Sequence, residues 1–218
     1  MPKQTTLDFQ HSNNYDKNNF LPSGCNQLAF DWINKFPNWN DQKISIVYGN
    51  KGCGKTHLGK IWQDKANALS VNKESNLEEV LQRLSIGENI LIDDCDQIKD
   101  DKFLYNLYNT SKEVASGFIL MTASSRPMDW GIELADAKSR IISLNAIVIN
   151  EPDDFLLSGI LVKLFADRQL IITPEVLNYL LLRMERSFSG AISLVEGIDK
   201  LSLEKKRNIT IPLIKDLL

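Results

Sequence analysis

The segment from Gly49 to Thr56 constrains this chain more than any other feature. Its sequence, GNKGCGKT, matches the phosphate-loop pattern G-x-x-x-x-G-K-[ST] at every fixed position. The β-branched run ISIVY precedes the segment, and apolar residues at helical spacing follow it. Glycines let the backbone approach phosphates closely, and successive N–H groups can then surround the phosphates at a helix N-terminus. This strand–loop–helix context predicts a nucleotide site in an α/β sheet.

Each fixed residue of the loop has an expected role. We expect the Lys55 ammonium to attract the β- and γ-phosphates and the Thr56 hydroxyl to ligate Mg²⁺. Because Cys53 lies close to Lys55, we expect its thiol pKa to be lowered, and we hypothesise that thiol oxidation blocks nucleotide binding. The predicted nucleotide-binding residues of the loop are Gly49, Asn50, Gly52, Cys53, Gly54, Lys55 and Thr56.

An acidic element lies about 40 residues downstream, as a phosphate-loop site of this type requires. The apolar run NILI at residues 89–92 is followed by Asp93 and Asp94. We expect Asp93 to hold Mg²⁺, directly or through water, and Asp94 to orient an attacking water. A strand that ends in two aspartates is weak evidence by itself, and the phosphate loop is what makes it informative.

Short apolar runs alternate with helical patterns between residues 26 and 149, which predicts parallel βαβ units and a doubly wound α/β sheet. The expected strands are Ile44–Tyr48 and residues 89–92, 118–121 and 146–149. The expected helices include residues 26–36, 103–114 and 129–139, and one that begins with a capping box at Ser75. After Pro152 the pattern becomes wholly helical. A helix is expected to begin at Thr173–Pro174, and residues 209–218 are expected to form a short strand or helical turn.

Composition excludes several classes of protein. Three cysteines without a C-x-x-C pair make a disulfide framework or a structural zinc site improbable, and a reducing cytoplasm is expected. The sequence contains no run of 18 apolar residues, so no membrane span is predicted, and the first residues lack the apolar region of a secretory signal. The net charge of −3, with no block of lysines or arginines, disfavours broad electrostatic binding to DNA.

Three segments, GKTHLGKIW, ILIDDCDQI and LADAKSRI, occur in the order and spacing of a known family. They resemble the AAA+ module of the bacterial replication initiator DnaA and, more closely, its short relatives, the Hda family of initiator regulators. The resemblance extends from about residue 19 to residue 218. It implies an α/β fold: a P-loop AAA+ module with a parallel five-stranded sheet and a C-terminal helical lid. ADP or ATP, with Mg²⁺, is expected between sheet and lid.

The resemblance also implies roles for individual residues. Thr122 or Ser124 matches the first sensor, a polar group that reads the γ-phosphate, and Arg140 in the segment KSR matches an arginine finger that enters a neighbouring subunit's site. Asp94 stands where many AAA+ enzymes have glutamate, so slow turnover is expected. The second sensor of the family is a lid arginine. The matching position here falls near Ser189 or Gly190, with Arg183 and Arg186 as possible substitutes.

Residues 1–18 form an expected flexible arm, which precedes the α/β subdomain at residues 19–150 and the lid at residues 151–218. In this arm, Gln4, Leu7 and Phe9 resemble the peptide Q-x-x-L-x-F with which bacterial proteins bind the sliding clamp. Two apolar side chains in an otherwise polar segment suit the apolar pocket of a partner. For the segment NFLP at residues 19–22 two interpretations stay open, a wall of the adenine pocket and a hydrophobic anchor for the arm.

The leading hypothesis is a cytoplasmic, replisome-associated regulator that inactivates DnaA by stimulating hydrolysis of its bound ATP at the sliding clamp. DnaA, the clamp and a second copy of the chain are the expected partners. The protein's own ATPase activity is expected to be weak or absent. Sequence-specific DNA binding is not expected, because the DNA-binding domain of DnaA would follow the lid and the sequence stops at Leu218. An autonomous AAA+ ATPase such as a helicase loader is the alternative, and a small-molecule phosphotransferase is a third, disfavoured by a lid with few basic residues.

Overall fold

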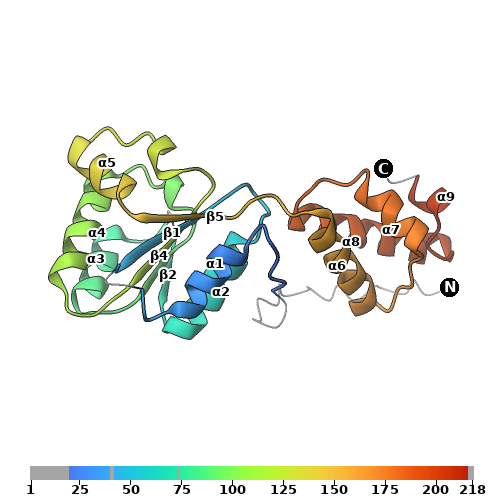
Figure 1. Cartoon of the computed structure of the whole chain (residues 1–218), viewed down its shortest axis with the longest axis horizontal. Coiled ribbons are helices and arrows are strands. Elements are labelled where there is room, and N and C mark those ends of the chain that lie inside the picture. Colours follow the sequence, from blue (N-terminus) through green and yellow to red (C-terminus); the bar gives the residue numbers. More distant parts are fainter. Residues whose placement is uncertain (1–19, 40–41, 73, 216–218) are drawn as a thin grey trace, which may run out of the picture.

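A parallel sheet of five strands forms the centre of the base, as we call residues 20–150 (Figure 1). The computed structural model describes residues 20–39, 42–72 and 74–215. The strand order is β2-β3-β4-β1-β5, and all four neighbouring pairs are parallel. The strands are β1 (Ile44–Tyr48), β2 (Leu69–Val71), β3 (Ile90–Ile92), β4 (Ile119–Ala123) and β5 (Asn145–Val148).

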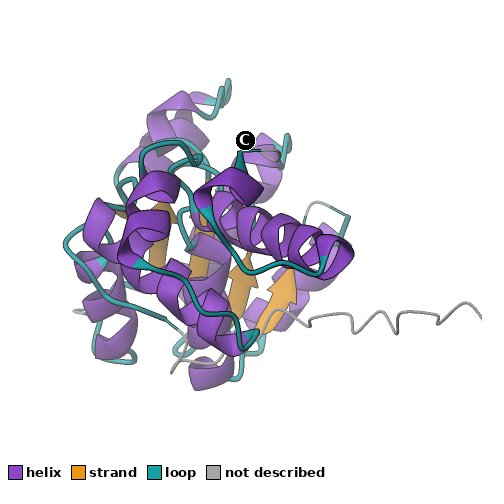
Figure 2. Cartoon of the chain, turned by 90° about the vertical axis from the view of Figure 1, so that its right-hand side faces the viewer, coloured by secondary structure: helices purple, strands orange, loops and turns teal. Residues whose placement is uncertain are grey.

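Helices cover both faces of this sheet (Figure 2), which is why the inner strands are apolar without alternation. In β3, Ile90 and Ile92 pack with the helices α3, α4 and α5, whereas Leu91 packs with α1 and α2 on the other face. The helices of the base are α1 (Gln27–Lys35), α2 (Lys55–Ala66), α3 (Leu77–Ser85), α4 (Asp101–Glu113) and α5 (Ala135–Ile142). Two short 3₁₀ turns, η2 (Cys95–Gln97) and η3 (Pro127–Asp129), follow β3 and β4.

Four helices form the lid, as we call residues 151–215, and they have a hydrophobic core of their own. They are α6 (Asp154–Asp167), α7 (Pro174–Leu181), α8 (Phe188–Lys205) and α9 (Ile211–Ile214). The segment before α1 joins the two parts: Phe20 is buried in the base, while Leu21 and Cys25 pack with the lid. The lid therefore docks through the residues that precede α1 as well as through its covalent connection after β5.

The structure confirms the predicted α/β fold and most of its elements. Strand β1 has the expected bounds, and Thr173 caps α7, because its side chain accepts a hydrogen bond from the Val176 N–H at 3.4 Å. Two expectations were wrong in detail: helix α3 is capped by Asn76 instead of Ser75, and the helix expected at residues 129–139 is a 3₁₀ turn followed by α5. Of the two alternatives for the C-terminal segment, the helical turn is confirmed by the short helix α9.

The described part of the chain contains no helix that is both long enough and apolar enough to cross a membrane.

Candidate nucleotide site

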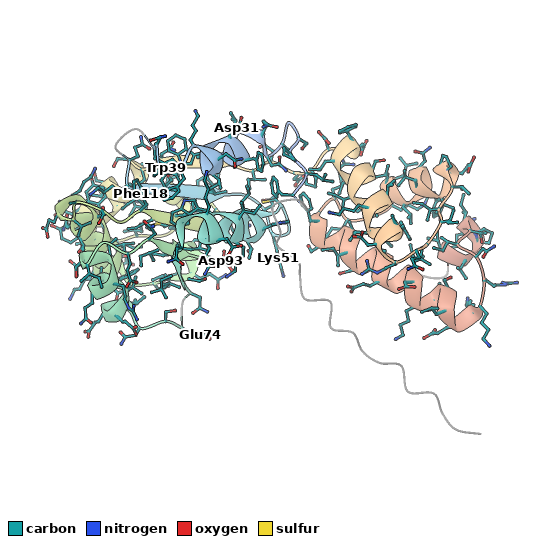
Figure 3. All side chains as sticks on the ribbon, turned by 90° about the horizontal axis from the view of Figure 1, so that it is seen from below. Asp31, Trp39, Lys51, Glu74, Asp93 and Phe118 are labelled. Carbon is teal, nitrogen blue, oxygen red and sulfur yellow. The ribbon has the colours of Figure 1, made fainter. Side chains whose placement is uncertain are left out.

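The phosphate loop, residues 49–56, connects β1 to α2 at the carboxyl edge of the sheet, on the side of the base that faces the lid (Figure 3, where Lys51 is labelled). Gly52 and Gly54 have φ angles of 74° and 101°, in the left-handed region that side chains disfavour. At Gly49 the reason for glycine is space, because a Cβ atom there would lie 2.3 Å from the Ile149 carbonyl oxygen. The glycine pattern is thus a consequence of this backbone path.

Lys55 is buried, with 6% of its surface exposed. Its ammonium group donates hydrogen bonds to the carbonyl oxygens of Gly49, at 2.8 Å, and Asn50, at 3.0 Å. The Asn50 side chain points elsewhere and donates to Glu151, where the base joins the lid, at 2.9 Å. The structure therefore keeps the Lys55 charge inside the loop, where a phosphate would replace the carbonyl partners.

The predicted magnesium residues lie together. The Thr56 hydroxyl is 3.3 Å and 3.5 Å from the two carboxylate oxygens of Asp93. Asp93 directly follows β3, which is separated from β1 by β4. A hydroxyl and one carboxylate suit Mg²⁺, which takes few protein ligands and completes its shell with phosphates and water. The Thr56 hydroxyl and the Asp93 carboxylate thus fit the Mg²⁺ ion that the sequence predicted. A bound Mg²⁺ ion would neutralise charge on the phosphates of the nucleotide.

Thr122 on β4 is fully buried behind Asp93. Its hydroxyl donates to the Asp93 carboxylate at 2.5 Å and accepts from the Asp94 N–H at 3.0 Å. The side chain predicted as a sensor therefore contacts the predicted metal ligand Asp93 and orients its carboxylate. Asp94 itself has a φ angle of 51° at the start of η2, and its role in orienting water stays a prediction.

Sequence reasoning missed Asp96. Its carboxylate accepts hydrogen bonds from the Ser124 N–H at 3.0 Å and the Ser125 hydroxyl at 3.3 Å, so it ties the turn after β3 to the loop after β4. Ser124, the other sensor candidate, is exposed and lies on this loop. The third aspartate in the segment DDCD was the available signal, but its partners are 28 and 29 residues away in sequence.

The expectation for Cys53 was wrong. Burial raises the pKa of the Cys53 thiol, and the nearby Lys55 charge only partly offsets this effect. A thiolate is needed for rapid reaction with oxidants, so the environment protects this cysteine at neutral pH. The described cysteines, Cys25, Cys53 and Cys95, are all free thiols and buried.

The lid closes over the loop through the start of α8. The Phe188 N–H donates to the Gly52 carbonyl at 2.9 Å, and a Cβ atom on Gly52 would lie 2.3 Å from the Ser189 hydroxyl. Neither proposed substitute for the second sensor has its guanidinium at the loop. Arg186 forms an ion pair with Asp154 at 2.6 Å, and Arg183 stacks on the Tyr179 ring at 3.9 Å from its centroid.

Phe20 lies next to the loop and is 6% exposed. It stacks on Phe30 with ring centroids 5.3 Å apart, and the His57 ring meets it edge-on. This packing supports the interpretation of the segment as a hydrophobic anchor. The predicted clamp-binding residues, Gln4, Leu7 and Phe9, lie outside the described residues.

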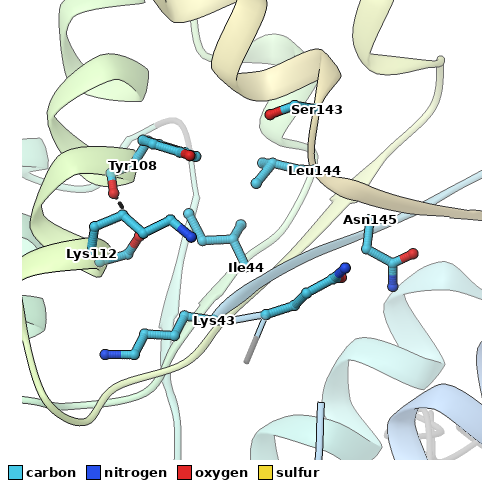
Figure 4. A pocket seen from close by; sticks show the side chains of 9 residues that line it. Lys43, Ile44, Tyr108, Lys112, Ser143, Leu144 and Asn145 are labelled. Atoms are coloured by element: carbon cyan, nitrogen blue, oxygen red, sulfur yellow. Dashed lines mark hydrogen bonds between the residues drawn. The ribbon is translucent and has the colours of Figure 1, made fainter. Parts of the chain in front are cut away.

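Arg140 lies at the opposite edge of the sheet from the phosphate loop. It occupies the last turn of α5, shortly before β5 begins at Asn145, and the strands run from this amino edge toward the loop. Its guanidinium donates to the Asn109 side chain at 2.8 Å and packs over the rings of Tyr105 and Tyr108. A cavity of 160 Å³ opens at the same edge, lined in part by Tyr108, Lys112 and Asn145 (Figure 4).

Comparisons with known proteins identify similar sequences and folds. The family model for the Hda lid domain matches residues 159–218. An uncharacterised protein of Haemophilus influenzae is 25% identical over 233 residues, which cover 100% of this chain and 99% of that protein. The chromosomal replication initiator protein DnaA of Buchnera aphidicola is 25% identical over 240 residues, and the match covers 99% of this chain but only 55% of DnaA.

Two solved structures show the same fold. Domain III of the Thermotoga maritima replication initiation protein DnaA superposes with a TM-score of 0.75 at 16% identity, covering 94% of this chain and 96% of that one. AMPPCP-bound DnaA from Aquifex aeolicus gives a TM-score of 0.67 at 19% identity, covering 88% and 65%. The chain therefore has the AAA+ fold of DnaA and carries a match to the Hda lid domain. In this AAA+ fold the phosphate loop, Thr56 and Asp93 lie together at the carboxyl edge of the sheet, and the loop contacts a lid of which residues 159–218 match the Hda lid domain.

Proposed function

We propose that this protein regulates replication initiation by stimulating hydrolysis of the ATP bound to DnaA, with Arg140 as the group that acts on the partner's nucleotide. In this proposal the protein's own nucleotide, ADP or ATP with Mg²⁺, holds the base and lid together and is hydrolysed slowly or not at all. The nucleotide analogue in the Aquifex aeolicus DnaA structure supports a nucleotide at this site.

The observation that carries the proposal is the position of Arg140. The sheet separates it from its own phosphate loop, because the two lie at opposite ends of parallel strands. A guanidinium at this edge can act on a phosphate only in another molecule. Arginine supplied in trans stabilises the charge that develops during phosphoryl transfer and raises the rate about 10³–10⁵-fold. Ile142, two residues from Arg140 on α5, is an exposed apolar side chain, which suits a protein surface in this region.

The lid supports slow hydrolysis of the protein's own nucleotide. Among the described lid arginines, Arg183 and Arg186 are held by Tyr179 and Asp154, so neither supplies a charge to the phosphate loop. The start of α8 offers the hydroxyl groups of Ser187 and Ser189 in that place. Hydroxyls can bind a phosphate but contribute no positive charge to the transition state.

Recruitment by the sliding clamp is the second part of the proposal. Gln4, Leu7 and Phe9 match the clamp-binding pattern, and a tether of this kind raises the effective concentration of the regulator near newly replicated DNA. A short peptide that orders on binding gives weak, reversible affinity, which suits a transient signal. The regulator would then act only where clamps remain on DNA.

The experiment is a DnaA ATPase assay with this protein, with and without clamp loaded on DNA. Arg140→Ala is expected to abolish stimulation, and the Leu7→Ala/Phe9→Ala double variant is expected to abolish its dependence on clamp. Arg83→Ala is the matched control, because it removes an arginine from a surface ion-pair cluster on α3. Stimulation retained in Arg140→Ala would contradict the proposal. Rapid ATP hydrolysis by this protein alone would favour the autonomous ATPase.

A further inference from the structure

Helix α4 holds the Arg140 side chain with three residues on one face. Tyr105, Tyr108 and Asn109 follow the i, i+3, i+4 spacing that places side chains together on a helix. The Arg140 guanidinium carbon lies 4.8 Å from the centroid of the Tyr105 ring and 5.1 Å from that of Tyr108. Asn109 accepts a hydrogen bond from Nη1 at 2.8 Å. We call these three residues the α4 cradle.

The cradle fixes the guanidinium without neutralising it. Within the described residues, no carboxylate lies in ion-pair range of Arg140, whereas Arg83, Arg168 and Arg186 each pair with aspartate or glutamate. Aromatic faces attract a cation and restrict its plane, but they leave its charge intact.

One edge of the guanidinium is left for an outside partner. The cradle uses Nη1, and no described residue accepts a hydrogen bond from Nε or Nη2. These two nitrogens form the planar fork that binds two oxygens of a phosphate. Arg140 is half-buried, so its side chain is held while part of it faces solvent.

We propose that Tyr105, Tyr108 and Asn109 are positioning residues, which hold the Arg140 guanidinium with its Nε–Nη2 edge directed outward, toward a phosphate in the partner. The inference rests on the proposed action of Arg140 in trans. Positioning matters because a displacement of about 1 Å in a catalytic group can lower a rate about 10²-fold. The cradle would convert a flexible side chain into a group that needs little reorganisation when the partner binds.

The test is the rate of DnaA-bound ATP hydrolysis, titrated with this protein and with DNA-loaded clamp present. Tyr105→Leu removes one ring and Asn109→Leu removes the acceptor, and each is expected to lower the plateau rate about 10-fold, within the range of misplaced catalytic groups. The concentration that gives half-maximal stimulation is expected to stay unchanged, since the interface itself is intact. Tyr105→Phe keeps the ring and is expected to restore the plateau.

Two controls separate this inference from the function on which it rests. Lys112→Ala removes the other cation over the Tyr108 ring, 5.5 Å from its centroid, and is expected to leave the plateau unchanged. In an Arg140→Ala background, Tyr105→Leu is expected to have no further effect. If Arg140→Ala itself has no effect, the proposed function fails. Thermal denaturation checks that the cradle variants are folded. If Arg140→Ala abolishes stimulation while folded cradle variants leave the plateau rate unchanged or raise it, only the cradle proposal is overturned.

Discussion

The two edges of the sheet in the base are built from the same strands but differ in how their charged groups are partnered. At the carboxyl edge, Lys55, Thr56, Asp93 and Thr122 bond to one another or to the phosphate loop, and the lid contacts that loop at Gly52. At the amino edge, two aromatic rings and one amide hold the Arg140 guanidinium. Its Nε and Nη2 atoms have no hydrogen-bond partner among the described residues.

This difference indicates a division of tasks between the edges. At the carboxyl edge, the Lys55 ammonium bonds to two carbonyl oxygens of the phosphate loop. It can exchange these partners for the phosphates of a nucleotide that stays bound. At the amino edge, the Arg140 guanidinium lies over aromatic rings of α4 and can bind a phosphate carried by another molecule. The same sheet therefore separates retention of nucleotide from action on a partner, and the separation can be tested edge by edge.

The largest expected effect is on nucleotide affinity. Lys55→Ala removes the buried ammonium of the phosphate loop, and charge-assisted bonds to phosphate are among the strong ones, so we expect ADP affinity to fall about 100-fold. Arg140→Ala is expected to leave ADP affinity unchanged, because the residue belongs to the other edge. Isothermal titration with ADP and Mg²⁺ measures both.

Lys51→Ala is the matched control for this test, since Lys51 is an exposed lysine of the same loop. Its loss is expected to have little effect on ADP affinity, because exposed charges are screened by solvent. A large loss of affinity in Arg140→Ala would remove the division between the edges, since it would place this arginine in its own subunit's nucleotide site.

A smaller effect is expected on stability. Gly49→Ala puts a Cβ atom 2.3 Å from the Ile149 carbonyl oxygen, which belongs to the backbone and cannot turn aside. We expect the free energy of unfolding to fall by about 2 kcal/mol, as for other overpacked sites. Gly24→Ala meets no atom within 4 Å and serves as the control. Chemical denaturation followed by circular dichroism gives both values.

The amino edge supplies the contrast for this measurement. Lys112 is exposed, and Lys112→Ala is expected to change the free energy of unfolding by less than about 0.5 kcal/mol. Equal losses in Gly49→Ala and Lys112→Ala would show that the two edges are equally constrained.

The sequence predicted those parts of the fold and site that depend on local pattern. The phosphate loop and β1 were found because glycine spacing and a β-branched run are visible in eight and five consecutive residues. Strand β2 was not found: Leu69–Val71 has three residues and becomes a strand because β3 offers it hydrogen bonds. Such a strand has no pattern of its own.

The rest of the site depends on contacts between distant residues. The raised pKa of the Cys53 thiol follows from burial in the folded protein, which its neighbours in sequence do not reveal. Asp96 and the α4 cradle were missed for the same reason, since their partners lie 28 or more residues away. Arg140 was identified from the family resemblance, because nothing in the local sequence pattern marks its role.

The smallest expected effect concerns how the carboxyl edge orients its metal ligand. Thr122→Val keeps the shape of the side chain but removes its hydroxyl, which leaves the Asp94 N–H without this acceptor and Asp93 without this donor. We expect the free energy of unfolding to fall by about 1 kcal/mol, the usual cost of a lost buried hydrogen bond. We also expect the difference in ADP affinity with and without Mg²⁺ to become smaller.

Ser45→Ala distinguishes these two consequences. Ser45 is also fully buried, and its hydroxyl accepts a hydrogen bond from the Trp32 indole at 2.9 Å, on β1 and away from Asp93. We expect a similar loss of stability, about 1 kcal/mol, without a change in the Mg²⁺ dependence of ADP affinity. Thr122→Ser, which restores the hydroxyl, should recover that dependence. If Thr122→Val and Ser45→Ala change the Mg²⁺ dependence of ADP affinity equally, Thr122 only stabilises the fold and does not orient the Asp93 carboxylate for the metal.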